Sequence, residues 1–371
     1  MEQEGHNSVE AQAEKHEWQI ENAEEVVPNG WRVTYSGGGL DVPQSWAFYD
    51  GKKLLVVDPG GELPVETVQD KLSIRGVARS LARSGETPKI NAIRELAEKY
   101  DTEVGAVLLT HGDADHTNNI ENISDASAPI HVGKKGNWSV MSPEKQFAVG
   151  RVKMRQSKYT GGQVGELGVR DVGFQIVATM LNNQRSTLPR GAHRAAKKHE
   201  IGQRLEEHPQ FYETEAGRLE VLHLPGHAPE EVGFYLPEQK LAITGDILAT
   251  SKPEQADRLN LFLAEANVYD ALASLQKLRE LEIEKLYPAH GSPVIGQEKI
   301  QEYLGRVEAD ARGIIERTLK FHEENPTATI QQLRPKVFTK EWQRKGMAPR
   351  SEETWILSIL RDRPVEDKGV G

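Results

Sequence analysis

The order of apolar and polar positions predicts strands along much of the chain. Residues 31–36 alternate as a half-buried strand does, whereas 54–57 and 104–109 are continuous apolar runs typical of fully buried strands. Asp50-Gly51 predicts a hairpin turn before the first of these runs. Shorter strand patterns follow at 129–132, 219–224, 232–236, 241–244 and 283–287. These segments indicate a protein rich in β-sheet.

Helical periodicity separates some of these strands and dominates the C-terminal part. Residues 90–100 and 267–281 each place apolar side chains on one face of a helix. From Gly296 onward the chain is predicted to be helical, with an apolar stripe from Ile300 to Ile315. Ser351 is the predicted N-cap of a last helix, because serine caps helices well and two acidic residues follow it.

The composition fits a globular protein and limits the chemistry. The 371 residues are 37% hydrophobic and 27% charged, and no apolar run is long enough to span a bilayer. The acidic N-terminus lacks the basic and apolar parts of a secretory signal, so we expect a cytoplasmic protein. The chain has no cysteine, which excludes disulfides and a thiol nucleophile. Any metal must therefore be held by nitrogen and oxygen atoms.

Charge is unevenly distributed along the chain. The formal net charge of -10 argues against a general binder of polyanions. Residues 133–209 are nevertheless rich in lysine and arginine, and we interpret them as a basic insertion. This insertion is either a solvated surface segment or a lid that attracts an anionic substrate, such as a coenzyme A or glutathione thioester, a phosphoester or RNA.

A cluster of histidine and aspartate residues follows the apolar run 104–109. It reads THGDADH over 110–116 and contains His111, Asp113, Asp115 and His116. Imidazole and carboxylate groups together suit divalent first-row metals. Alternate residues at the exit of a strand can point the same way, so His111 and Asp113 can share one ion. Asp115 and His116 lie further along the loop, where they can reach a second ion.

Neither pair completes a coordination shell, and three other positions can supply more ligands. His227, Asp246 and His290 each follow an apolar strand, and each stands beside a glycine. The same local design at several strand ends favours a metal site over isolated turn residues. The other histidines receive no such role. His131 and His223 are expected to be packed or hydrogen-bonded, and His208 is expected to be solvated.

These segments resemble the motifs of the metallo-β-lactamase-fold metallohydrolase superfamily. The matching stretches, in order, are LVVDPGG (55–61), THGDADH (110–116), LPGHAPEEVGF (224–234), ITGDIL (243–248) and PAHG (288–291). The resemblance covers about residues 31–296. It implies an α+β fold, an αββα sandwich that holds its metals at one edge between two sheets. The polar composition of the N-terminus predicts a leader at 1–25. The resemblance implies the sandwich domain at 26–296 and a mostly helical C-terminal domain at 297–371, similar to the winged-helix-like tail of lactamase-β-like hydrolases.

The resemblance also assigns roles to individual residues. Asp246 would bridge two divalent metal ions, and Asp58 would brace the loops around them. The remaining ligands would divide into His111, Asp113 and His227 for the first ion, and Asp115, His116 and His290 for the second. Zinc is the first expectation for both ions, with manganese or iron as alternatives.

Asp113 departs from the usual family motif, which has a second histidine at this place. The extra carboxylate makes the site one charge less positive, so its bound water should be a weaker acid than in the usual site. A shell richer in carboxylates also suits Mn²⁺ or Fe²⁺ better than an imidazole shell does.

The implied activity is that of a metal-dependent hydrolase in which a metal-bridged hydroxide attacks a small ester, thioester or lactone. Asp115 and Asp246 are the predicted catalytic residues, and Asp115 would also guide a proton to the leaving atom. A phosphodiesterase or ribonuclease is one alternative, although the segment from Asp246 to His290 is short for a nuclease. A di-iron oxidoreductase is another. The expected partner is a small-molecule substrate, which can be anionic. Binding of nucleic acid is a weaker expectation, and no contact with a membrane is expected.

Overall fold

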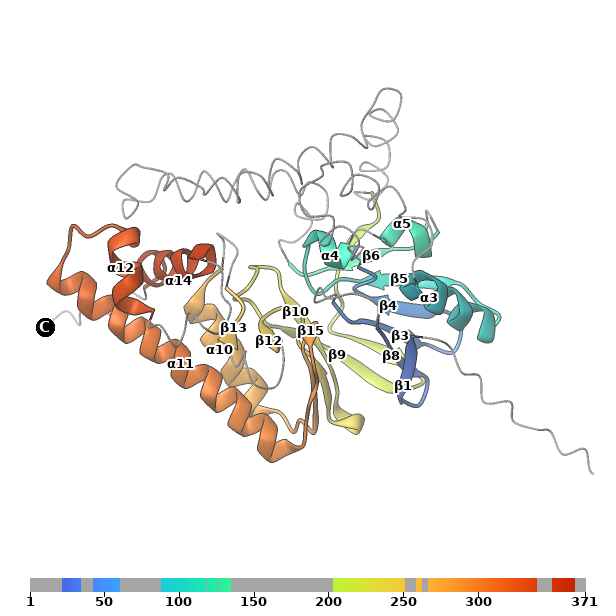
Figure 1. Ribbon diagram of the computed structural model, residues 1–371. Helices are drawn as coiled ribbons and strands as arrows, with labels where there is room; N and C mark the ends of the chain where they lie inside the picture. Colours follow the sequence, from blue (N-terminus) through green and yellow to red (C-terminus); the bar gives the residue numbers. More distant parts are fainter. Residues whose placement is uncertain are drawn as a thin grey trace, which may run out of the picture.

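The computed structural model describes residues 22–34, 43–60, 88–117, 119–125, 127–134, 203–250, 258–261, 266–338 and 349–363. Within these ranges two β-sheets face one another and helices cover both outer faces (Figure 1). This confirms the αββα arrangement with a mostly helical C-terminal extension. Nearly all of the predicted basic insertion, residues 135–202, lies outside the described residues.

In the described part of the chain, the first sheet has seven strands. They are ordered β1 (Ala23–Val27), β2 (Gly30–Val33), β3 (Ser45–Tyr49), β4 (Leu54–Val57), β5 (Val104–Leu108), β6 (Ile130–Val132) and β7 (Leu205–Glu207). The strands from β1 to β4 pair antiparallel, and those from β4 to β7 pair parallel. The two continuous apolar runs are β4 and β5, in the centre of the sheet, as their composition predicts.

The two outermost strands of the first sheet, β1 and β7, lie in segments that the sequence analysis places outside the sandwich core, in the leader and in the basic insertion. β1 begins at Ala23, so the end of the predicted leader is part of the first sheet. β7 lies within the range 133–209 and pairs with β6, so the end of that range extends the same sheet.

The second sheet lies opposite the first and has six strands among the described residues. They are ordered β16 (Val294–Ile295), β14 (Lys285–Tyr287), β11 (Leu241–Ile243), β10 (Val232–Leu236), β9 (Gly217–His223) and β8 (Phe211–Thr214). β11 and β14 are parallel, so the chain leaves both strands at the same edge. A small sheet of β13 (Arg258–Leu259), β12 (Leu248–Thr250) and β15 (His290–Gly291) lies beyond that edge.

The core between the sheets is formed by large apolar side chains from both. Trp46 and Phe48 of β3 pack in one cluster with Phe234 of β10 and Ile243 of β11. On the outer face of the first sheet, α3 (Pro88–Lys99) contributes Ile93 and other buried residues to a second cluster. Burying such side chains contributes about 1.5–3 kcal/mol each, which holds the strand ends in fixed positions.

The helical extension shares its core with the second sheet. α10 (Val268–Glu280), α11 (Gln297–Glu324), α12 (Ile330–Val337) and α14 (Pro349–Arg361) lie together on the outer side of that sheet (Figure 1). The side chain of Asn267 caps α10 by accepting the backbone N–H groups of Tyr269 and Asp270. The prediction of Ser351 as the N-cap of the last helix is wrong, because α14 begins at Pro349 and Ser351 lies within its first turn. Proline is well suited to the first turn of a helix.

Among the described residues, no helix is both long and apolar enough to cross a membrane.

Candidate metal centre

Six of the seven predicted ligands come together at one edge of the sandwich. His111 and Asp113 follow β5, and His116 lies in the short helix α4 (Ala114–Thr117). From the second sheet, His227 follows β9 and Asp246 follows β11, while His290 begins β15. Each side chain is therefore placed by the end of an element whose apolar residues are fixed in the core.

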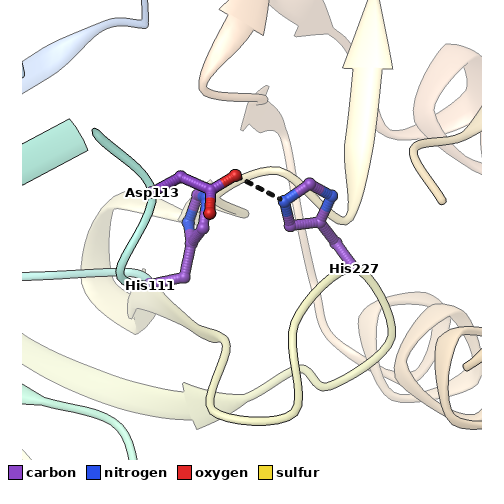
Figure 2. Close-up of side chains that lie close together, drawn as sticks. All are labelled: His111, Asp113 and His227. Atoms are coloured by element: carbon purple, nitrogen blue, oxygen red, sulfur yellow. Dashed lines mark ion pairs between the residues drawn. The ribbon is translucent and has the colours of Figure 1, made fainter. Parts of the chain in front are cut away.

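His111, Asp113 and His227 form the first group of donor atoms. Figure 2 shows the Asp113 carboxylate beside the two imidazole rings. Its Oδ2 atom lies 3.7 Å from Nε2 of His111 and 3.5 Å from Nε2 of His227. Both rings are fully buried, and the Asp113 side chain is only 12% exposed. The three donors therefore surround one small enclosed space.

Asp246 joins this group to a second one. Its Oδ2 atom lies 3.9 Å from Nε2 of His111 and 3.8 Å from Nε2 of His227. Its Oδ1 atom lies 3.4 Å from Nε2 of His116 and 3.2 Å from Nε2 of His290. The two oxygens of one carboxylate thus face two different pairs of histidines, as a bridging ligand requires.

The seventh predicted ligand is placed less completely. Asp115 lies in α4, between Asp113 and His116, but its side chain is outside the described part of the chain. Its role as a ligand stays a prediction.

The distances between donors fit shared metal ions. Donor atoms held about 2.0–2.2 Å from one tetrahedral ion lie about 3.4 Å from each other. The observed separations of 3.2–3.9 Å are close to that value. Two buried atoms in the cluster, Nε2 of His111 and Oδ1 of Asp246, make no hydrogen bond with any described residue. Buried polar atoms normally have a partner, so both are suited to accept a cation.

The hydrogen bonds behind the rings select the nitrogen that can bind a metal. Nδ1 of His227 lies 2.8 Å from the carbonyl oxygen of Asn260, which can only accept, so this nitrogen carries the proton. Nδ1 of His116 lies 2.9 Å from Asp58, and Nδ1 of His111 lies 3.0 Å from the hydroxyl of Thr110. In each neutral ring the lone pair then lies on Nε2, the atom that faces the centre of the site.

Asp58 has the bracing role that the resemblance implies. Its carboxylate accepts the backbone N–H of Thr110 at 2.8 Å and the hydroxyl of Thr110 at 2.6 Å, besides contacting His116. One buried side chain thereby links the ends of β4 and β5 to α4. Because the Thr110 hydroxyl donates its hydrogen to Asp58, its oxygen can accept a hydrogen bond from Nδ1–H of His111.

Burial and charge oppose each other within the cluster. Burial alone would lower the pKa of His227, but the nearby carboxylates of Asp113, Asp246 and Glu231 raise it to about 10. Burial would raise the pKa of Asp246, but the surrounding histidines hold it well below its usual range. In the metal-free protein the carboxylates therefore stabilise protons on the imidazoles, and a bound cation would take the place of those protons.

Two residues of the centre have no role assigned in the sequence analysis, although one of them, Glu231, lies within the matching stretch 224–234. Glu231 is fully buried and accepts the backbone N–H of Asp246 at 2.6 Å, and burial raises the pKa of its carboxyl to about 7. Asn260 bonds both His227 and Asp246. Glu231 precedes an apolar strand, and Asn260 stands between two leucines in a short segment. Neither pattern differs from that of an ordinary loop residue.

The prediction for His208 is wrong, since this ring is held between other groups. Its Nε2 atom lies 2.9 Å from the carbonyl oxygen of Leu109, and its Nδ1 atom lies 2.8 Å from the hydroxyl of Tyr212. Burial lowers the pKa of His208 to about 4. His131, predicted to be packed, stacks on it with ring centroids 5.9 Å apart.

Comparison with known sequences decides the family. A sequence profile described as the metallo-beta-lactamase superfamily matches residues 38–290. The chain belongs to this superfamily. Its members typically bind divalent metals, and the two described groups of donors, His111 with Asp113 and His227, and His111 with His116 and Asp246, lie close enough to hold them.

Curated relatives include proteins with several printed activities. A Beta-lactamase-like protein 2 homolog from Caenorhabditis elegans is 23% identical over 67% of this chain and 64% of its own length. A linear primary-alkylsulfatase from a Pseudomonas strain is 29% identical over 36% of this chain and 21% of its own. The hydroxyacylglutathione hydrolase GloC of Haemophilus influenzae is 36% identical over 22% of this chain and 37% of its own. The chain thus spans less than two thirds of each of these relatives.

Solved structures support the fold over a larger part of the chain. A beta-lactamase domain protein from Burkholderia ambifaria has a TM-score of 0.55 at 14% identity, and covers 91% of this chain and 87% of its own. A metallo-beta-lactamase family protein from Thermus thermophilus has a TM-score of 0.50 at 17% identity, covering 91% and 94%. At these identities the likeness concerns the fold alone.

Proposed function

We propose that this protein is a metal-dependent hydrolase of a small ester, thioester or lactone. The observation that carries the proposal is the position of Asp246, whose two oxygens face two separate pairs of histidines within 3.9 Å. A carboxylate in this position suits a pair of metal ions, and hydrolases are among the named relatives.

The residues have the following proposed roles. His111, Asp113 and His227 hold one ion, His116 and His290 hold the other, and Asp246 is shared. When bound, the two ions lower the pKa of a water molecule and polarise the oxygen of the electrophile. Asp115 is proposed as a further ligand that also handles the proton of the leaving group. Zinc is the first choice of metal, with manganese or iron as alternatives because of the Asp113 carboxylate.

The names of the relatives, rather than the charge of the site, favour an acyl substrate. Asp113 and Asp246 are both ionised carboxylates, and Glu231 is a third acidic group that is fully buried beside them. Two bound divalent ions would outweigh these carboxylates, so the charge of the site does not by itself exclude an anionic substrate. Two relatives named as a carboxyl ACP thioesterase and a hydroxyacylglutathione hydrolase support an acyl substrate.

A linear alkyl sulfate is a second candidate substrate. The similarity to a linear primary-alkylsulfatase extends over 133 residues at 29% identity, and it is the observation in favour.

The test combines metal analysis with a substrate panel. The protein is purified, its metal content is measured, and it is assayed against thioesters, lactones, simple esters, a linear alkyl sulfate, phosphodiesters and RNA. We expect about two divalent ions per chain and hydrolysis of at least one acyl substrate, lost on removal of the metal and restored by adding it. RNA or sulfate ester cleavage without acyl hydrolysis would overturn the proposed substrate class. A protein that binds no divalent metal would overturn the function itself.

A further inference from the structure

Asn260 is in contact with two of the proposed ligands at once. Its backbone carbonyl oxygen lies 2.8 Å from Nδ1 of His227. Its side-chain Nδ2 lies 3.3 Å from Oδ2 of Asp246 and donates to it. The two atoms that these ligands turn towards the site, Nε2 of His227 and Oδ2 of Asp246, are 3.8 Å apart. A single residue therefore sits behind both members of this pair.

The backbone of Asn260 is held in place by its neighbours. Leu259 and Leu261, on either side of it, are each only 1% exposed. The backbone N–H of Asn260 donates to the carbonyl oxygen of Ile247 at 3.2 Å, and Leu259 is in register with Leu248 in the small sheet. Asn260 is thus fixed relative to the segment that carries Asp246.

Asn260 restricts the rotation of the Asp246 carboxylate. Its backbone N–H is already fixed by Glu231 at 2.6 Å. The carboxylate can still rotate about its last bond, because the preference for one angle there is weak. A donor on Oδ2 opposes this rotation and keeps Oδ1 directed at His116 and His290.

We propose that Asn260 is a positioning residue, which sets the orientation of the Asp246 carboxylate through its amide and of the His227 ring through its carbonyl. This inference deepens the proposed function and rests on it, since it takes both partners as metal ligands. Hydrogen-bond partners behind metal ligands typically change metal affinity by about 10–100-fold.

An amide suits this position better than a second carboxylate would. The cluster already holds the buried acidic groups Asp58, Asp113, Glu231 and Asp246. Asparagine supplies a donor to Asp246 without adding negative charge, whereas aspartate would place like charges 3.3 Å apart.

The experiment compares two variants that remove the amide in different ways. Asn260→Leu keeps the number and branching of the side-chain heavy atoms and loses the donor, and Asn260→Ala loses both. Both keep the backbone carbonyl that bonds His227, so the change is confined to Asp246. Asn325→Ala is the matched control, because Asn325 caps the end of α11 and does not belong to the site.

Metal affinity, measured by competition with a chelator, is the main readout. The visible absorption of the cobalt(II)-loaded protein reports the ligand geometry, and thermal unfolding of the metal-free protein reports the fold. We expect a 10–100-fold loss of affinity and an altered cobalt spectrum in both Asn260 variants, with the control unchanged. On an active substrate, kcat should fall more than KM rises.

The outcomes separate this inference from the function on which it rests. Wild-type affinity and spectrum in Asn260→Leu, with loss only in Asn260→Ala, would mean that the side chain acts by filling space, and would overturn the inference. So would wild-type behaviour of both. Unfolding of a metal-free variant at a temperature far below the wild type would assign Asn260 to stability and overturn it too. If the affinity falls as expected but no acyl substrate is hydrolysed by the wild type, the positioning role stands and the proposed substrate class fails.

Discussion

The carboxylate of Asp58 lies 2.9 Å from Nδ1 of His116, and the opposite nitrogen of the same ring lies 3.4 Å from Asp246. The ring is therefore oriented from behind by one carboxylate and faces another in the site. Because Asp58 also accepts two hydrogen bonds from Thr110, it aligns the exit of β5 at the same time. Asp58, in the stretch 55–61, thus positions ligands that belong to the stretch 110–116.

Asp58→Asn tests this link. Asp58 has a φ of 44°, a conformation that asparagine tolerates as well as aspartate, so the change alters the charge without straining the backbone. The amide would direct a donor at groups that are themselves donors, and we expect metal affinity to fall about 10–100-fold in a folded protein. Asp101→Asn is the control, since Asp101 also has a positive φ of 49° but is exposed and distant in sequence from the motif. Equal losses of metal affinity in the two variants would contradict the positioning role of Asp58.

Removal of a ligand itself should have a larger effect. His227→Ala takes one donor from the first group, and Asp246→Ala takes the atoms that face both groups. We expect each variant to lose metal and hydrolytic activity while the metal-free protein stays folded, because neither side chain belongs to the three apolar clusters. Metal content, activity and a thermal unfolding curve are measured together. His223→Ala, at the exposed end of β9, should behave like the wild type. Wild-type activity in either ligand variant would refute the metal centre.

The charge of Asp113 should affect the pH optimum of the enzyme. Asp113→His replaces an ionised carboxylate with an imidazole, which makes the metal-loaded site one charge more positive. A more positive site favours the deprotonated form of the attacking water, so the pH optimum should move down by about one unit. The pH profile of kcat for the variant and the wild type, each with measured metal content, checks the direction. An upward or absent shift would refute it.

The sequence predicted the ligands better than it predicted their supports. His111, Asp113, His227 and Asp246 could be found because metal binding restricts residue types and places them at strand ends. Glu231 acts through one contact with the backbone of Asp246, and Asn260 acts through its carbonyl on His227 and its amide on Asp246. The contacts of Asn260 depend on the pairing of β12 with β13, and that of Glu231 on the pairing of β10 with β11, which no periodicity encodes.

The helices and His208 also show that periodic apolar patterns predict burial better than local sequence predicts contacts between distant segments. The amphipathic pattern of 267–281 predicted α10 because one face of the helix is buried. The start of α14 was misplaced because a serine followed by acids is a local signal, whereas the preceding proline begins the helix earlier. His208 was misjudged because its polar neighbours in sequence do not reveal that Leu109 and Tyr212 enclose it.

The enclosed His208 ring should make stability depend on pH. Its pKa is about 4 in the folded protein, against about 6.5 in the unfolded chain. Between these values the unfolded state binds a proton that the folded state does not, so this contribution to stability falls as the pH falls from about 6.5 to about 4. Allowing for partial exposure, the loss is on the order of 2 kcal/mol. Denaturant unfolding of His208→Gln at pH 7 and pH 4.5 should show a smaller difference between the two pH values than the wild type. The exposed His223→Gln should keep the wild-type difference.

Gly226, the residue before His227, explains how closely the ligand loop can approach α10. Its φ is 152°, and an added Cβ would lie 2.6 Å from the Cα of Ala271, a backbone atom that cannot move without shifting the helix. Gly226→Ala should therefore cost about 2–4 kcal/mol of unfolding free energy, the sum of a strained backbone and an overpacked contact. It should also weaken metal binding, since His227 must move with the loop.

Gly305→Ala is the matched control: Gly305 lies within α11 with nothing within 4 Å of an added Cβ, and alanine there should stabilise the protein by about 0.5–1 kcal/mol. Denaturant unfolding of both variants, metal-free and metal-loaded, measures the two effects. If Gly226→Ala were as stable as the wild type, α10 would not constrain the loop that carries His227.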